Sequence, residues 1–495
     1  MFVKTIDTTY RYKTLMTCSP YGATLFYKNL LTIRDYFHII YNEILFECIT
    51  LHVLGEIMGL KVLKFGGSSL ADAEHFRAVA KIIKSDPTRR YVVASAPGKR
   101  NSKDIKITDM LYTCYEMATD EKDFSEIFQA IKDRYDGIIH ELGIDLDLTE
   151  VYEKIRLSFL HNSGRDYIAS RGEYLNAMIL AKYLDFHFID AKKCIFFNDD
   201  GNFNAERTNE VLKDYLSRYD YAVIPGFYGS MPNGTIKTFS RGGSDITGSI
   251  VARAATASLY ENWTDVSGFL MADPRCINNP AVIDTITYKE LRELSYMGAT
   301  VLHEDAIFPV RYSKIPINIR NTNRPEDRGT FIVPKTDEVP AHVITGVAGK
   351  VGFSTITIEK DMMNAELGFG RRVLQAIEDN GVSFEHFPSG IDTMSVVLST
   401  KELAKKRADI MAAICKAVNP ENIFIEENLA LIAIVGRGMV KAKGTAARIF
   451  SALANAGVNI RMIDQGSCEL NIIVGVDEND YIIALKAIYD EFVNK

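Results

Sequence analysis

The chain has 495 residues, of which 47% are hydrophobic and 24% are charged, and its formal net charge is −7. This composition is ordinary for a globular chain with a real core, and the length leaves room for roughly three domains. The acidic balance argues against a general nucleic-acid binder, which normally shows a basic surplus. No apolar run reaches the roughly 18 residues of a membrane span.

The seven cysteines form no C-x-x-C pair. We therefore expect a reducing cytoplasm and neither a disulfide framework nor a zinc site.

Residues 1–57 are set apart from the rest of the chain. They are rich in Tyr, Phe, Ile and Leu, yet they show no clean helical or strand period. Charged and polar interruptions exclude a signal-peptide core in this region. Residues 54–58 can be encoded by TTAGGAGAAATTATG, a purine-rich ribosome-binding sequence a few bases before an ATG. We interpret residues 1–57 as leader sequence upstream of a true start at Met58; the alternative is a disordered or capping extension.

From residue 58 to about 335, apolar β-rich runs alternate with helical patterns. Strands are expected at 61–65, 91–95, 221–225 and 259–263, and helices at 70–84, 104–118, 167–184 and 245–258. Strands separated by helices imply βαβ units, and hence an α/β domain with a mainly parallel sheet sandwiched by helices. Ligands of such sheets bind outside the carboxyl ends of the strands.

A first glycine pair follows the strand at 61–65. The stretch KFGGSS places Lys64 at the strand end, before Gly66, Gly67 and Ser68, and it matches neither common phosphate-binding motif. Glycines let the backbone approach a phosphate, and successive N–H groups at a helix start form an anion site. The alternative is an ordinary strand-to-helix turn with a solvated lysine.

Three polar residues come next along the chain. Ser95 lies at a strand end, Thr108 at the start of a helix, and Glu173 in ASRGEYLNA at the expected start of another helix. Glu173 is either a ligand-binding carboxylate or a favourable charge in a first helical turn.

A second glycine pair lies in FSRGGSDITG. Gly242, Gly243 and Ser244 open a helix, which predicts a second anion site. Arg241 is suited to bind a carboxylate through two hydrogen bonds. Asp245 either caps the helix or accepts a substrate ammonium, and the two roles are compatible.

The stretch NWTDVSGFLMADPR follows the strand at 259–263. Thr264 and Asp265 lie at its carboxyl end, where an Asp suits a ribose or magnesium-bound water, and Arg275 suits nucleotide phosphates. The alternative is a polar loop. His303 has no residue at metal-ligand spacing, so we interpret it as structural and assign no metal ligand.

The remainder of the chain contains an internal repeat. Gly368, Gly381 and Gly390 recur at one constant spacing as Gly444, Gly457 and Gly466, and both copies read as helix, glycine C-cap, strand, turn and strand. The first copy is a βαββαβ unit at 350–427, with strands at 351–358, 382–387, 393–399 and 423–426 and a helix at 401–418. The second copy ends with a helix at 478–493 and has no fourth strand after it. We expect residues 343–347, which precede the first copy, to form that strand. We therefore expect the first unit to be inserted into the second, which comprises 341–349 plus 428–495.

Taken in this order, the motifs closely resemble aspartate kinase, a member of the amino acid kinase family. The resemblance covers nearly all of 60–495 and rests on KFGGSSLAD, TFSRGGSDITG and WTDVSGFLMADPR, followed by two repeats that look like ACT domains. It implies transfer of a phosphoryl group from ATP, with Mg²⁺, to the β-carboxylate of L-aspartate, the entry step to lysine, threonine and methionine. A carboxylate is already a nucleophile at pH 7, so the reaction needs positioning and positive charge rather than a strong base.

The resemblance also implies a role for each site residue. The transferring phosphoryl group would be approached by Lys64, Gly66, Gly67 and Ser68. Aspartate would be bound by Ser95, Thr108, Glu173, Arg241, Gly242, Gly243, Ser244 and Asp245. The nucleotide would be faced by Thr264, Asp265 and Arg275. Two departures from the family pattern bear on nucleotide affinity and base selectivity. Thr300 replaces a common lysine that can touch nucleotide phosphate, and Leu270 replaces a tyrosine close to the nucleotide.

The ACT-like repeats imply a homodimer or larger assembly and feedback inhibition by an end-product amino acid. Lysine is the preferred effector and threonine the runner-up. Met363, Phe369 and Glu385 would line the effector site, with Glu385 meeting a cationic side chain; the alternative is two core residues and a solvated glutamate. Two rival functions remain, an amino acid kinase with a glutamate-type substrate and a catalytically silent amino-acid sensor.

Overall fold

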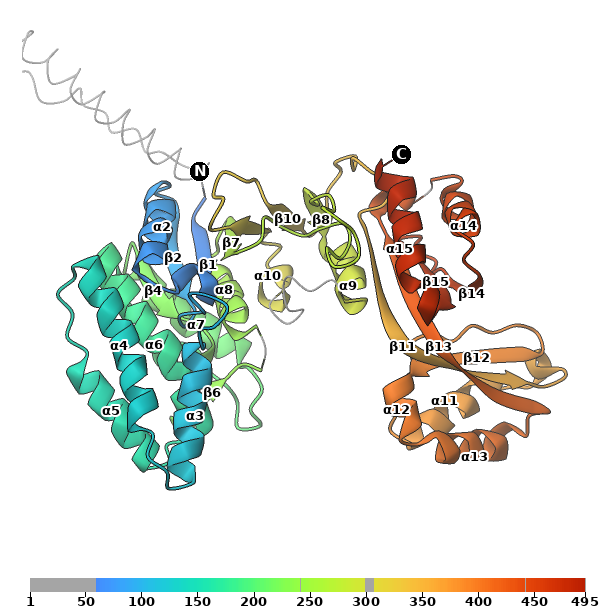
Figure 1. Cartoon of the computed structure of the whole chain (residues 1–495), viewed down its shortest axis with the longest axis horizontal. Helices are drawn as coiled ribbons and strands as arrows, with labels where there is room; N and C mark the ends of the chain where they lie inside the picture. The colour runs from blue at the N-terminus through green and yellow to red at the C-terminus, as the bar shows by residue number, and fades with distance from the viewer. Residues whose placement is uncertain (1–58, 241, 299–306, 441, 495) are drawn as a thin grey trace, which may run out of the picture. The chain divides into compact units, whose positions relative to one another are not determined.

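The computed structural model describes residues 59–240, 242–298, 307–440 and 442–494 (Figure 1). Contacts divide the chain into two units, Met1–Gly59 and Leu60–Lys495, and the second unit contains all the helices and strands named below. The expected extension at 1–57 and the residues Arg241, Thr300 and His303 lie outside the described residues. Within the described ranges, no helix is long and apolar enough to cross a membrane.

An eight-stranded sheet organises the first part of this unit. Its order is β3-β4-β2-β1-β7-β9-β10-β8, and neighbours run parallel except β9 and β10. The expected mainly parallel sheet is thereby confirmed. Its strands are β1 (Lys61–Phe65), β2 (Arg89–Ala94), β3 (His187–Phe188), β4 (Ala222–Pro225), β7 (Leu259–Thr264), β8 (Thr285–Thr287), β9 (Ile317–Asn321) and β10 (Thr330–Val333). A separate hairpin consists of β5 (Tyr228–Ser230) and β6 (Ile236–Thr238).

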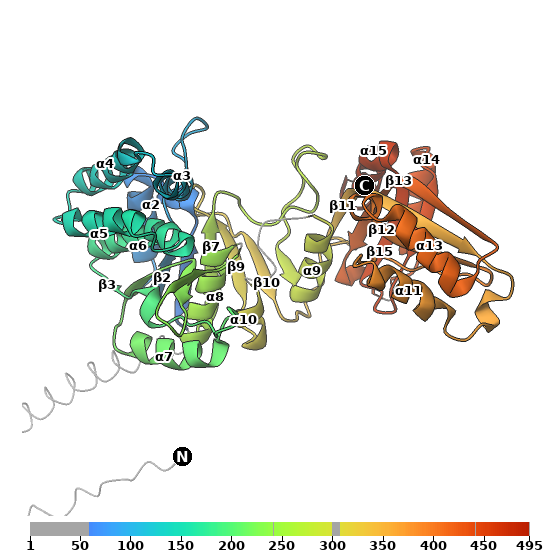
Figure 2. The ribbon, with the colours of Figure 1, turned by 90° about the horizontal axis from the view of Figure 1, so that it is seen from below.

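Helices cover both faces of the eight-stranded sheet (Figure 2). Val62 and Val93 pack into one hydrophobic core, whereas their neighbours Leu63 and Val92 pack into another, because side chains alternate along a strand. The helices of the second core are α2 (Ala73–Lys84), α3 (Ile107–Thr119), α4 (Ser125–Leu142), α5 (Thr149–Leu160) and α6 (Arg165–Leu184). Those of the first core include α7 (Ala205–Ser217) and α8 (Gly243–Ala254). Burial on both faces explains why the central strands read as apolar runs.

Two helix starts differ from their predicted positions. After β1, residues Gly67–Leu70 form a 3₁₀ turn, and α2 begins only at Ala73, where the Asp72 carboxylate accepts a hydrogen bond from the His75 backbone N–H at 3.0 Å. The helix α6 begins at Arg165, so Glu173 lies in its middle. The interpretation of Glu173 as a first-turn charge is therefore wrong.

A five-stranded antiparallel sheet follows, in the order β12-β11-β13-β15-β14. Its strands are β11 (Gly346–Glu359), β12 (Thr393–Ser399), β13 (Asn422–Val435), β14 (Ile460–Asp464) and β15 (Asn471–Asp477). β11 and β13 pair along their whole length, with register shifts between Lys350 and Thr355. The strand expected at 351–358 and the last two residues of the one expected at 343–347 are therefore parts of one strand, because pairing with β13 continues across both. The helices of this region are α11 (Phe369–Asp379), α12 (Thr400–Ala404), α13 (Arg407–Val418), α14 (Thr445–Asn455) and α15 (Tyr481–Tyr489).

The strand expected at 382–387 is only partly formed. The Glu385 backbone N–H donates to the Val397 carbonyl at 2.8 Å, and the Val397 N–H donates to the His386 carbonyl at 2.9 Å. The pairing continues past this point only as single contacts: the Ser395 N–H donates to the Pro388 carbonyl at 2.9 Å, and isolated bridges form at His386 and Ser389. The helix expected at 401–418 is likewise divided into α12 and α13.

The helix α9 (Tyr288–Tyr296) is tied to the five-stranded sheet through one buried carboxylate. Glu290 accepts hydrogen bonds from the Thr345 hydroxyl at 2.6 Å and the Arg437 backbone N–H at 2.8 Å. The same carboxylate completes a capping box with Thr287 at the helix start. Burial alone would raise the pKa of Glu290, but the hydrogen bonds outweigh it and lower the pKa.

Replacing Glu290 with alanine is expected to lower the free energy of unfolding by about 3–5 kcal/mol, because Arg437 would lose its buried partner. The contribution of ionised Glu290 is full above the ordinary carboxyl pKa of 4.5 and is lost as the pH falls through the lower folded value. Thermal unfolding at pH 7 measures the loss, with the exposed Glu338→Ala variant as control. Equal melting temperatures for the two variants would contradict this role.

Candidate functional site

Three parallel strands end at one edge of the eight-stranded sheet, and predicted site residues follow each of them. β1 leads into Gly66 and Gly67, β2 into Ser95, and β7 ends at Thr264. The Gly66 N–H donates to the Trp263 carbonyl at 3.0 Å, which ties the end of β1 to that of β7. This edge is where α/β sheets bind ligands.

The first glycine turn is held by close backbone packing. The Gly98 N–H donates to the Gly67 carbonyl at 2.8 Å, and a Cβ on Gly67 would lie 2.8 Å from the Ala96 carbonyl oxygen. No larger residue fits at Gly67 without displacing backbone. Ser68 continues the 3₁₀ turn, and Asp72 caps α2 further along. The glycine pair therefore leads into a 3₁₀ turn and not into the start of α2, where the anion site was predicted.

Lys64 forms a short, shielded ion pair at this edge. Its Nζ lies 2.6 Å from Asp245 Oδ1, and the same oxygen accepts a hydrogen bond from Asn262 Nδ2 at 2.9 Å. Lys64 is 8% exposed, and it is the register partner of Asn262 across β1 and β7. The structure thus brings together the two most specific motifs. Asn262 was missed in the sequence because a strand amide gives no local signal.

The second glycine pair starts α8. Gly242 has φ of 60° and ψ of 26°, a left-handed conformation that favours glycine. Gly243, Ser244 and Asp245 form the first turn, and no side chain caps the helix. Asp245 is therefore not a capping residue, and its carboxylate pairs with Lys64 instead. Arg241 lies outside the described residues.

Glu173 is a buried carboxylate with an orphaned oxygen. The residue is 6% exposed, and Oε2 has no hydrogen-bond partner in the described part of the chain. Burial raises the pKa of Glu173 to about 8, although the Ala96 backbone N–H stabilises the charged form. An unpaired buried polar atom is costly unless a ligand satisfies it. A substrate ammonium would supply both a donor and the opposite charge.

Ser95 and Thr108 belong to elements that pack around Glu173. The Ser95 carbonyl accepts a hydrogen bond from Asn176 Nδ2 at 2.7 Å, from the next turn of α6. A Cβ on Gly172 would lie 2.9 Å from the Cβ of Ala96 and 3.6 Å from the Cγ2 of Ile107. The neighbours of Ser95, Thr108 and Glu173 are therefore in contact. Asn176, which carries no signal in the sequence, connects α6 to the end of β2 through this hydrogen bond.

A large cavity opens next to the end of β7. Its volume is about 910 Å³, within the size range of small-molecule sites. Its lining includes Asp265, Leu270 and Arg275 from the segment after β7, Lys350 from β11 and Tyr481 from α15. Thr264 is adjacent, and its hydroxyl lies 3.1 Å from Asp265 Oδ1.

Arg275 is oriented by a neighbouring carboxylate. Its guanidinium donates to Asp273 at 2.6 to 3.0 Å, and the side chain is largely exposed. The hydrogen bonds to Asp273 raise the pKa of Arg275 above its usual value. Arg275 thus lies at the cavity but is already paired there.

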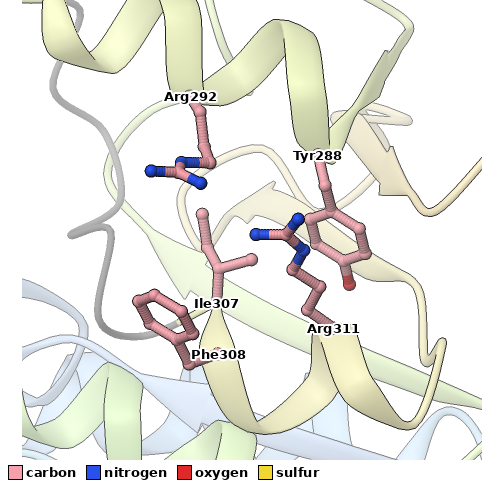
Figure 3. Close-up of a pocket in the computed structure, with 5 residues that line it drawn as sticks. All are labelled: Tyr288, Arg292, Ile307, Phe308 and Arg311. Carbon is pink, nitrogen blue, oxygen red and sulfur yellow. The ribbon is translucent and has the colours of Figure 1, made fainter.

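A second pocket lies between α9 and α10 (Phe308–Tyr312) (Figure 3). Arg292 and Arg311 project into it next to Tyr288 and Phe308. Its volume of about 10 Å³ holds roughly one water molecule, so it is too small for a nucleotide or an amino acid.

The three predicted effector residues differ in their environment. Met363 and Phe369 are 4% and 3% exposed and belong to the hydrophobic core that includes Ile356. Their side chains are closed off from solvent, as the core alternative anticipated. Glu385 is not merely solvated, because it accepts a hydrogen bond from the Tyr296 hydroxyl of α9. Burial and that hydrogen bond raise the pKa of Tyr296 to about 12, so Tyr296 stays a donor at neutral pH.

Comparison with known proteins places these features in a family. The amino acid kinase family model matches residues 59–321, more than half of the chain, and an ACT domain model matches 432–492. Aspartokinase 3 of Bacillus subtilis is 38% identical over 448 residues, which cover 88% of this chain and 98% of that protein.

Solved structures agree with this match. The crystal structure of Clostridium acetobutylicum aspartate kinase is 53% identical, with a TM-score of 0.79, and covers 88% of this chain and 100% of that chain. E. coli aspartokinase III in complex with lysine and aspartate is 25% identical, with a TM-score of 0.64, and covers 88% and 99%. The chain therefore belongs to the amino acid kinase family, and within it to the aspartate kinases.

Proposed function

We propose that this chain transfers the γ-phosphoryl group of ATP to the β-carboxylate of L-aspartate, giving 4-phospho-L-aspartate and ADP. The reaction would open the route to lysine, threonine and methionine. The observation that carries the proposal is the shielded Lys64–Asp245 pair at the glycine turns, together with the orphaned oxygen of Glu173. No strong base is required, because the accepting carboxylate is already ionised at pH 7.

Lys64 supplies the charge that phosphoryl transfer between two anions needs. Its ammonium, aligned by Asp245 and Asn262, would bind the transferring group as the phosphate enters over Gly66 and Gly67. Positioning and electrostatic stabilisation account for most of the catalysis in such reactions. Asp245 then exchanges part of its contact with Lys64 for the substrate ammonium.

The remaining residues divide between the two substrates. Glu173 and Asp245 would bind the ammonium of aspartate, and Arg241 its α-carboxylate. The other aspartate contacts would come from Ser95, Thr108, Gly242, Gly243 and Ser244. The nucleotide would occupy the cavity next to Thr264, Asp265 and Arg275, with Ser68 at the phosphate end. The support is the position of these residues at one sheet edge and around one cavity.

Mg²⁺ fits this site as a companion of the nucleotide rather than as a resident ion. The described residues contain no group of three His, Cys, Asp or Glu side chains able to hold a metal. Asp265 and Thr264 offer oxygen ligands of the kind that Mg²⁺ accepts directly or through water. The ion would supply charge neutralisation of the phosphates when bound.

The substrate assignment is tested by ATP consumption with aspartate and with glutamate. We expect turnover with aspartate alone. Turnover with glutamate alone would assign the chain to a different acceptor, and no turnover with either would favour a catalytically silent sensor.

Regulation by an amino acid follows from the ACT match. We propose two interleaved ACT units, at 350–427 and at 341–349 plus 428–495, which share the long strands β11 and β13. The effector would be lysine, bound near Glu385, Met363 and Phe369. Lysine is bound by the E. coli enzyme that this chain resembles, and the negative charge of Glu385 suits a cationic side chain.

Lysine at 10 mM, about a thousandfold above a Kd near 10 μM, is expected to inhibit the wild type, and threonine is the comparison. The Glu385→Gln variant should need at least about tenfold more lysine, since a charge-assisted contact is lost. The exposed Glu378→Gln variant, on α11, serves as control. An initial rate unchanged by lysine in the wild type would reject lysine as the effector.

We also propose that the enzyme is a homodimer in the cytoplasm. Met362, Leu367, Ile391 and Phe384 are exposed apolar side chains on the first ACT unit, and such residues suit a homodimer through the ACT domains. The five cysteines within the described residues are all free, which suits the cytoplasm.

A further inference from the structure

The five-stranded sheet contributes a lysine to the cavity that we assign to the nucleotide. Lys350 lies on β11 and lines the 910 Å³ cavity together with Asp265 and Arg275. It comes from a part of the chain outside the amino acid kinase match, which ends at residue 321. The motifs that predict the nucleotide site give no indication of it, since Lys350 lies outside all of them, at the start of the first repeat unit.

Lys350 is the last regularly paired residue before an irregular segment of β11. The pairing of β11 with β13 shifts in register directly after Lys350 and resumes at Phe353. Gly352, in between, has φ of 90°, a conformation that favours glycine. Bulges of this kind re-aim side chains and are common beside functional sites.

The Lys350 side chain is supported but its charge is not neutralised. Its stem runs along Gly298, where a Cβ would lie 3.6 Å from Cγ and 3.7 Å from Cε of the lysine. Its ammonium lies 5.1 Å from the ring centroid of Tyr296, and Glu385 accepts the hydrogen bond of the Tyr296 hydroxyl. No described carboxylate forms an ion pair with Lys350, whereas Arg275 is paired with Asp273.

These observations single out one cation for an incoming anion. Arg275 and Lys350 are the two cations among the described residues that line the cavity, and only Lys350 keeps its charge unpaired. A cation–π contact orients an ammonium without cancelling its charge. Lysine on a supported stem is a common phosphate ligand in nucleotide sites.

We propose that Lys350 binds a phosphate of the nucleotide, so that the ACT-bearing sheet completes the nucleotide site. This inference rests on the proposed nucleotide role of the cavity. It also connects the ACT-bearing sheet to nucleotide binding, because a displacement of β11 would remove a phosphate ligand. By linkage, a nucleotide that contacts Lys350 stabilises the position of β11 in which this contact forms.

The test is equilibrium binding of ADP and of adenosine to the full chain by calorimetry. Lys350→Ala is expected to weaken ADP binding by about tenfold, the value of one charge-assisted contact, and to leave adenosine unchanged. Lys350→Arg should restore ADP binding because it keeps the charge. The exposed Lys401→Ala variant, on α12 of the same region, is the matched control and should bind like the wild type.

The Arg275→Ala variant distinguishes the role of Lys350 from the assignment of the cavity to the nucleotide. If Arg275→Ala weakens ADP binding and Lys350→Ala does not, the nucleotide site stands and the role of Lys350 is overturned. Equal losses of ADP and adenosine in Lys350→Ala overturn it as well, because they indicate packing rather than phosphate binding. If neither variant affects ADP, the nucleotide does not occupy this cavity and the underlying assignment fails.

Discussion

Replacing Lys64 with alanine is expected to lower kcat by about 10³-fold or more, with a smaller effect on the KM for ATP. Removing one preorganised group from a transition state costs about 10²–10³ in rate, and Lys64 is a full charge that is largely shielded from water. Its interaction with phosphate grows as charge redistributes during transfer, so the loss falls mainly on kcat. The measurement is initial rates with ATP and aspartate as each is varied.

The Lys64 variant needs a check that its fold survives, because Asp245 loses its partner. Lys64→Met keeps the apolar stem, and Asp245 retains the hydrogen bond from Asn262. Lys61→Ala is the matched control: Lys61 lies on the same strand but pairs with Asp86 at 2.7 Å. A Lys64→Met enzyme that folds and keeps kcat within threefold of the wild type would remove Lys64 from the catalytic site.

Replacing Glu173 with glutamine is expected to weaken aspartate binding by about 10²-fold, because a buried charge-assisted contact with the ammonium is lost. The wild type should also show a pH signature. The pKa of Glu173 is about 8 in the free protein, so at pH 7 the carboxyl is mostly protonated and must ionise to accept the ammonium. Aspartate binding should therefore tighten by about tenfold for each pH unit gained below pH 8 and level off above it.

Proton release distinguishes this mechanism from a structural role. Aspartate binding at pH 7 should release close to one proton, which calorimetry detects in buffers of different ionisation enthalpy. Glu173→Gln should abolish both the release and the pH dependence, and Glu150→Gln, an exposed change on α5, should preserve them. Proton release of the same size in Glu173→Gln would show that another group titrates.

The fold of the kinase part was predictable because its signals are local. Apolar runs such as Lys61–Phe65 and helical spacing such as that of α2 are visible within a few residues, and burial of the sheet on both faces keeps its strands apolar. The glycine pairs were predictable for the same reason. A position where two backbone segments approach closely, or where the backbone is left-handed, favours glycine, and this preference is visible in the sequence. The strand expected at 382–387 was not predictable in the same way, because it meets β12 only at isolated bridges, and pairing between distant segments leaves no local signal.

The sequence by itself determined which residues have the chemistry for phosphoryl transfer and which elements carry them. Only the tertiary structure decided how they act: that Asp245 pairs with Lys64, that Glu173 is a buried carboxylate of raised pKa in mid-helix, and that Lys350 of the distant five-stranded sheet reaches the cavity. The physical reason is that desolvation and ion pairing depend on groups far apart in the chain. Local periodicity holds no information about either.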